Sequence, residues 1–138
     1  MGMFAKSDLD RFGIPEELIE AFLFTWGVEG WSWYDDARLI SDLMLRTDVT
    51  GDFVEIGCWK GKLSIILATV AKLRGRGERL VCVDPFEGWD YIQDGYAPPP
   101  IGHPLRAPTY EHFMNNITRI HSESLNIIKN ILGLNQHM

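Results

Sequence analysis

Two acidic residues and two glycines stand near the ends of predicted strands, with a spacing that suits binding of a charged small molecule. Residues 52–61 show the pattern of a buried strand that reaches an acid at Glu55 and passes into a turn at Gly57 and Gly61. A helix follows, and the next predicted strand ends in Asp84. Open α/β sheets hold nucleoside-containing ligands with this order of strand, glycine turn, helix, strand and acid.

Each residue would supply a different part of such a site. Gly57 permits a sharp turn and lets a ligand approach the backbone, and Gly61 lets the new helix pack closely on the strand. The N–H groups at the helix start favour a carboxylate or a phosphate. Asp84 can accept both hydroxyls of a ribose, and Glu55 can hold an ammonium group directly or through water. Ser64 can cap the helix or donate to the carboxylate of the ligand.

A ligand with a ribose, a carboxylate and an amine is S-adenosylmethionine. A dinucleotide fits less well, because its motif is G-x-G-x-x-G and Trp59 occupies the position of the second glycine. A pyrophosphate would meet the indole at that point. The pattern therefore predicts an S-adenosylmethionine site, with a dinucleotide oxidoreductase as the weaker alternative.

The same residues resemble a known family. Residues 51–64, G-D-F-V-E-I-G-C-W-K-G-K-L-S, are similar to the first motif of class I S-adenosylmethionine-dependent methyltransferases, in particular the macrocin O-methyltransferase-like group. Residues 84–89, D-P-F-E-G-W, resemble its D-[ST]-F-E-G segment, and residues 36–39 resemble the segment before its first strand. The resemblance covers about residues 35–90. It implies a Rossmann-like methyltransferase fold and adds Arg38 to the residues expected to face the cofactor.

The resemblance also implies an activity, which is methyl transfer from S-adenosylmethionine to an oxygen of a small-molecule acceptor such as a sugar. The catalytic base and the metal-binding aspartates of that group lie on later strands that this sequence does not supply. We therefore assign no catalytic residue and no metal ligand, and the four histidines show no metal-ligand spacing. The expected protein is a fragment of a longer methyltransferase or a short protein that completes its sheet with a partner. The alternative is a noncatalytic nucleoside-binding or assembly module that retains the cofactor half.

The chain is long enough for one domain, residues 1–138, and its apolar periodicity predicts an α/β fold with two or three parallel strands. Its four segments are N-terminal helices over 1–50, a cofactor-binding unit over 51–84, a proline-rich loop over 85–108 and a C-terminal segment over 109–138. The predicted helices are one that opens at residues 14–17, one over about 35–46 and one over about 62–73, and the predicted strands are 53–56 and about 79–83.

The last third allows two interpretations. Residues 117–120 form a third strand, with Ser122 capping a final helix through Leu132, or one helix runs from Thr109 to Leu132. The resemblance favours the strand, because that group places an acid or a serine after its third strand. Ser122 and Glu123 would then lie near the adenine.

Aromatic residues and prolines mark two further features. The aromatic residues Trp26, Trp31, Trp33 and Tyr34 are expected mainly in the core, and their exposure together would indicate a dimer surface. Trp59 is expected to pack under the N-terminal helices, and the alternative is that it covers the cofactor or lines the substrate pocket. The 85–108 loop suits a substrate-facing lid and a plain surface insertion equally well.

Composition limits the partners and the compartment. A net charge of -6 argues against nucleic acid, which needs a basic face. The sequence has no apolar run of about 18 residues and no signal-peptide pattern, so we expect no membrane span and a cytoplasmic location. Cys58 and Cys82 are expected as small buried thiols in a reducing compartment. A sheet of two or three strands leaves its edges and one face poorly covered, which predicts a homo-oligomer.

Overall fold

The computed structural model describes residues 13–88, 100, 102–103, 106–121 and 128–132. These residues form four helices, which are α2 (Glu16–Thr25), α3 (Tyr34–Arg46), α4 (Lys62–Arg74) and α6 (Tyr110–His121). One sheet holds β1 (Phe53–Ile56), β2 (Leu80–Asp84) and β5 (Ile128–Leu132), and a two-stranded ribbon holds β3 (Glu87–Gly88) and β4 (Ala107–Pro108). The predicted α/β class is confirmed.

The three-stranded sheet is parallel throughout, in the order β1-β2-β5. Phe53 lies opposite Leu80, and Leu80 lies opposite Ile128. The pairing extends into the turn after β1, where the Gly57 N–H donates to the Val83 carbonyl at 2.8 Å. Because the strands are parallel, the carboxyl ends of β1 and β2 lie at the same end of the sheet. The predicted site lies at this end.

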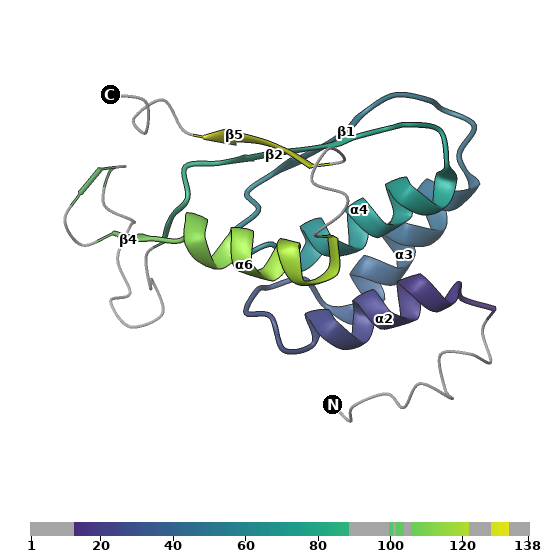
Figure 1. The fold of residues 1–138 in the computed structure, drawn as a ribbon, viewed down its shortest axis with the longest axis horizontal. Coiled ribbons are helices and arrows are strands. Elements are labelled where there is room, and N and C mark those ends of the chain that lie inside the picture. The colour runs from purple at the N-terminus through teal and green to yellow at the C-terminus, as the bar shows by residue number, and fades with distance from the viewer. Residues whose placement is uncertain (1–12, 89–99, 101, 104–105, 122–127, 133–138) are drawn as a thin grey trace.

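The described helices cover one face of this sheet. Figure 1 shows the strands along the top of the molecule and the four helices below them. Glu55 and Cys82, which lie opposite each other in the register, are buried on the covered side. On the other side Val54 and Ile56 are 62% and 81% exposed. Among the described residues, the uncovered side of β1 therefore agrees with the predicted sheet that has one poorly covered face.

Helix α4 lies at the centre of the core because nearly every side of it meets apolar neighbours. Its buried residues Ile65, Ile66 and Val70 are at most 1% exposed. Helix α2 packs against it through Leu18, Ile19 and Phe22, and α6 contributes Phe113 and Ile117. The helix ends at Gly75, whose left-handed backbone (φ +63°) is the common glycine stop.

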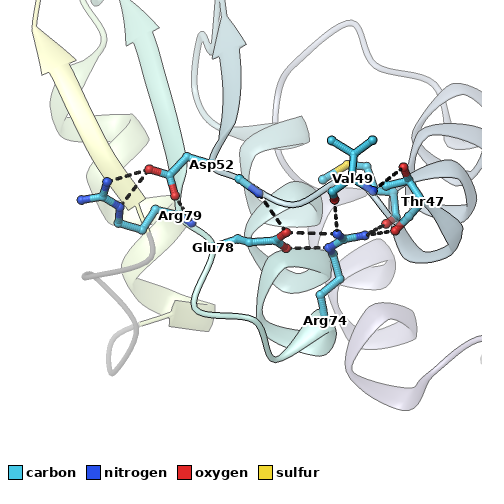
Figure 2. Close-up of polar contacts among 8 residues, drawn as sticks. Thr47, Val49, Asp52, Arg74, Glu78 and Arg79 are labelled. Carbon is cyan, nitrogen blue, oxygen red and sulfur yellow. Dashed lines mark hydrogen bonds and ion pairs between the residues drawn. The ribbon is translucent and has the colours of Figure 1, made fainter.

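A buried cation ties the end of α4 to the segment that leads into β1. All five N–H donors of Arg74 are used (Figure 2), by the Glu78 carboxylate and by the carbonyls of Met44, Thr47 and Val49. The distances from Arg74 to Glu78 are 2.5 and 3.0 Å, and the two side chains are 2% and 4% exposed. The hydrogen bonds that Arg74 donates to the Glu78 carboxylate raise the pKa of Arg74 and lower the pKa of Glu78.

The third strand lies later in the chain than predicted. Residues 117–120 belong to α6, because Tyr110, Phe113, Met114 and Ile117 form a helical stripe that packs towards α4 and Phe86. A continuous helix to Leu132 is also wrong, since residues 128–132 form β5. Ser122 and Glu123 lie outside the described residues, as do residues 89–99, 101 and 104–105 of the proline-rich loop.

The other predicted elements agree with the structure within a residue or two. Strand 53–56 is confirmed without change, and helices α3 and α4 differ from prediction by one residue at an end. None of the described helices has the length and apolar character that a membrane crossing requires. Trp26, Trp31 and Trp33 are 39%, 67% and 64% exposed, so their predicted place in the core is wrong, whereas Tyr34 packs against the core.

We predict that Arg74→Ala lowers the urea midpoint of unfolding much more than Arg79→Ala does. Removal of Arg74 leaves the buried Glu78 carboxylate without its partner and takes the donor from three backbone carbonyls, two of them partly buried, which is costly. Arg79 also pairs bidentately with an acid, Asp52, but its side chain is 53% exposed, and exposed pairs contribute little. Equal shifts of the midpoint in urea titrations of the two variants would contradict this assignment.

Candidate functional site

A cleft of about 860 Å³ opens at the carboxyl end of β1, a size that suits a small molecule or a cofactor. Its walls come from four parts of the chain: the loop before α3, the turn after β1, the start of α4, and the β3–β4 ribbon with the start of α6. The lining residues are Glu29, Gly30, Trp31, Ser32, Glu55, Gly57, Cys58, Trp59, Lys60, Lys62, Leu63, Gly88, Ala107, Pro108, Thr109 and His112. Of the six residues that the sequence nominated, Glu55 and Gly57 are in this lining.

Asp84 joins the end of β2 to the turn after β1. One oxygen of its carboxylate accepts the Trp59 N–H at 2.9 Å, and the other accepts the Phe86 N–H at 2.6 Å. The side chain is 9% exposed and does not line the cleft. The predicted proximity of Asp84 to the glycine turn is therefore present, and the carboxylate already holds the backbone on both sides of it.

Glu55 is a buried carboxyl group at the edge of the cleft. It is 8% exposed, and it accepts the Ser64 hydroxyl at 2.5 Å from the first turn of α4. Burial raises the pKa of Glu55 to about 7, helped by the nearby charge of Asp84 and opposed by hydrogen bonds from Ser64 and Cys58. Its charge therefore changes in the neutral range. Ser64 itself is fully buried behind Glu55 and is not part of the lining.

The two glycines of the turn have different physical roles. Gly57 has φ +86°, and an added Cβ would meet no atom within 4 Å, so the backbone conformation and not a clash requires glycine. At Gly61 (φ +87°) an added Cβ would lie 3.1 Å from the Phe113 ring. Gly61 thus makes room for α6, whereas the sequence suggested close packing of α4 on the strand.

Arg38 is not brought to the cleft. It lies on α3, where it donates to the Tyr34 hydroxyl at 3.3 Å and lies 3.9 Å from the Asp42 carboxylate. Both partners belong to the same helix, and the cleft lining does not include Arg38. The expectation that Arg38 faces the cleft is therefore not met by its place on α3.

Trp59 and Thr109 form part of the cleft wall; the sequence offered this place for Trp59 only as the alternative to packing, and it did not identify Thr109. Trp59 has the left-handed backbone (φ +51°), and its ring packs against Gly88, where an added Cβ would lie 2.6 Å from it. The prediction that Trp59 packs under the N-terminal helices is wrong. The indole Nε1 and the Thr109 hydroxyl are buried with no hydrogen-bond partner among the described residues, so both can serve a bound molecule.

The ends of the proline-rich loop also reach this wall. Strands β3 and β4 pair antiparallel, with Glu87 opposite Pro108, and the Thr109 N–H donates to the Phe86 carbonyl at 2.8 Å. The side chain of Phe86 is fully buried against Phe113 despite its left-handed backbone. The only sequence signal for this pairing is the long loop that begins directly after Asp84. Because β2 ends at the site, the residues that follow it begin beside the site.

The cleft rim carries opposite charges. Lys60 contacts Glu29 at 2.5 Å, and its ammonium lies 5.5 Å from the centre of the Trp59 ring. The Asn116 side chain donates to the Lys60 carbonyl at 2.8 Å, which links α6 to the turn. Lys62 adds a second cation at the start of α4. The site thus has an acid on its floor and cations at its rim, an arrangement that suits a zwitterionic ligand.

The sequence matches no protein-family model, and no curated protein matches it. The function of this site therefore has to be argued from its geometry and from the motif that leads into it.

We predict that the wild-type protein loses stability as the pH rises from about 5 to about 7.5, relative to Glu55→Gln. The folded-state pKa of about 7 lies above the ordinary value of 4.5, so the folded protein holds this proton more tightly than the unfolded chain does. The resulting stabilisation is complete below about pH 4.5 and is lost as the pH approaches about 7, a change on the order of 3 kcal/mol.

Urea unfolding of both proteins at a series of pH values, with a metal chelator present, measures this difference. Glutamine keeps the neutral shape of the carboxyl group and has no proton to lose, so its profile should lack this slope. Identical slopes in the two proteins would show that Glu55 titrates near its ordinary pKa.

Proposed function

We propose that the cleft binds S-adenosylmethionine and that the chain belongs to a methyltransferase fold acting on an oxygen of a small molecule. The main support is one arrangement: β1 ends at the glycine turn, Asp84 at the end of the adjacent parallel strand β2 holds this turn, and the cleft opens over it. In open α/β sheets, ligands bind in the crevice outside the carboxyl ends of the strands.

The residues present fit the parts of this cofactor. Glu55 lines the cleft and, when ionised, can bind the ammonium of the methionine moiety. Lys62 and Leu63 line it at the first turn of α4, where N–H groups and the helix dipole favour the carboxylate. Gly57 leaves open space above the backbone. S-adenosylmethionine, when bound, supplies an electrophilic methyl group, and the chain's task is to hold the acceptor in line with it.

The position of Asp84 restricts its predicted contact with the ribose of the cofactor. Asp84 lies behind the turn, and both of its oxygens already accept backbone N–H groups. Each carboxylate oxygen can accept a second hydrogen bond, so Asp84 can serve a ribose only while it also holds the turn. This observation favours the second candidate in its form without a ribose contact, a noncatalytic assembly module in which Asp84 only holds the turn.

The sheet order also supports a Rossmann-like fold. The first three strands of the doubly wound order lie as 3-2-1, and the described sheet, taken from β5 through β2 to β1, has this sequence. Helix α4 connects β1 to β2, and α6 lies between β2 and β5 in the chain. The Rossmann-like assignment is a proposal that rests on this order and on the glycine turn.

We predict that Gly57→Ala weakens binding of S-adenosylhomocysteine at least about tenfold, whereas Gly77→Ala changes it less than about twofold. Both glycines have positive φ (+86° and +71°), and an added Cβ meets nothing within 4 Å at either. The backbone strain is therefore matched, but only Gly57 lines the cleft. Isothermal titration calorimetry measures both affinities. No binding to the wild-type protein, or equal losses in the two variants, would contradict the proposed cofactor site.

We also predict that the affinity for S-adenosylhomocysteine rises between about pH 6 and about pH 8. Glu55, with a pKa of about 7, becomes an anion over this range and then attracts the ligand's ammonium. The gain should be up to about tenfold. Glu55→Gln should bind more weakly at the higher pH and show no such rise. A rise of the same size in the variant would remove Glu55 from the site.

A further inference from the structure

We propose that Glu55, Cys58 and Cys82 form a binding site for one thiophilic divalent cation of the Zn²⁺ type. One ligand atom from each residue, a carboxylate oxygen and two sulfurs, lies within 4.8 Å of the other two, and all three residues are buried. This site is independent of the proposed cofactor function, because it rests on the three side chains alone.

The fold brings these residues together from distant parts of the sequence. The parallel register places Glu55 directly opposite Cys82, so both side chains lie on the helix-covered face of neighbouring strands. The chain then turns at Gly57, and the Cys58 thiol points back towards the strands, where it donates to the Glu55 carbonyl at 3.4 Å and lies 3.8 Å from the Val83 carbonyl. A sequence search for closely spaced ligands cannot find this group.

The dimensions suit a tetrahedral ion. Zinc–sulfur bonds of about 2.3 Å and zinc–oxygen bonds of about 2.0–2.2 Å separate neighbouring ligand atoms by about 3.5–3.8 Å. The observed limit of 4.8 Å requires a contraction of at most about 1.3 Å. Side-chain rotation can supply this movement, because the backbone of β1 and β2 already sets Glu55 beside Cys82 and the turn brings the Cys58 thiol back to the Glu55 carbonyl.

The chemistry of the donors determines which metals fit. Two thiolates select Zn²⁺, Cd²⁺ or Cu⁺ over Mg²⁺ and Ca²⁺, which prefer oxygen ligands. Ser64 donates to the Glu55 carboxylate and so fixes its orientation, as outer partners of metal ligands do. Glu55 and Cys58 both line the cleft, which provides the access route and a fourth, open coordination position.

Metal binding must displace protons to balance charge. Both thiols lose a proton on coordination, and the two positive charges of the ion neutralise the two thiolates. Glu55 adds one negative charge and releases a proton when it is protonated beforehand. In the metal-free site, the contact with Cys82 and burial both raise the pKa of the Cys58 thiol, so coordination has to displace its proton. Binding should therefore release about two to three protons per ion and weaken steeply at low pH.

The test is titration of the reduced, full-length chain with Cd²⁺, monitored by the ultraviolet sulfur-to-cadmium charge-transfer band, with Zn²⁺ as competitor. We expect one Cd²⁺ per chain, loss of the band on addition of Zn²⁺, and a higher melting temperature with metal. Cys58→Ser and Cys82→Ser should each weaken binding more than about 100-fold, because loss of an outer partner alone costs about 10–100-fold. Ser64→Ala should fall within that smaller range.

Glu29→Gln is the control for general acidity of the cleft, since Glu29 lines the same cleft outside the triad. It should bind Cd²⁺ as the wild-type protein does, whereas Glu55→Gln should bind more weakly. Absence of the charge-transfer band in the wild-type protein would overturn the proposal even if a cysteine variant failed to fold. Binding without the band, for example through histidines, would overturn it as well. The cofactor proposal is tested separately, by calorimetry with S-adenosylhomocysteine in metal-free buffer. Neither outcome of the Cd²⁺ titration changes that measurement.

Discussion

The hydrogen bonds that Asp84 accepts from the two segments beside it are the constraint on which the candidate site depends. One oxygen holds the Trp59 N–H after β1, and the other holds the Phe86 N–H after β2. Trp59 and Phe86 both have left-handed backbones, which cost free energy in residues other than glycine. A buried acceptor that binds both N–H groups offsets this cost. The indole wall of the cleft and the buried Phe86 ring therefore share one carboxylate as their support.

Much of the fold could be predicted because its decisive signals are local. The apolar run of β1, the helical spacing of α4 and the glycines on either side of it each lie within a short window, and the structure agrees with them. The C-terminal third lacked such a signal. Ile117 and Ile120 fit both a short strand and one side of a helix, and contact of α6 with α4 and Phe86 decides for the helix. That contact depends on tertiary packing, which periodicity in a single sequence does not contain.

The candidate site was predictable only along its strand ends. The sequence could predict Glu55, Gly57 and Asp84 as site residues, because parallel strands bring their carboxyl ends to the same end of the sheet. It could not predict Thr109 and His112, since they reach the cleft through the β3–β4 pairing across a long loop. Glu55 also has a second set of neighbours: the strand register brings Cys82 beside it, and the turn after β1 brings Cys58. An ammonium in the cleft and a metal ion between the sulfurs would use the same carboxylate, so the two ligands are expected to exclude each other.

The two ends of the sheet differ in how many contacts a single substitution would disturb. At the amino end Arg74 satisfies Glu78 and three carbonyls at once, so a substitution at either charged position disturbs every partner. At the carboxyl end the outer walls come from residues 29–32 and 107–112, which lie on loops and on the start of a helix. During evolution a descendant of this chain could replace those wall residues, and so change the molecule it accommodates, without touching the arginine and glutamate that keep the scaffold intact.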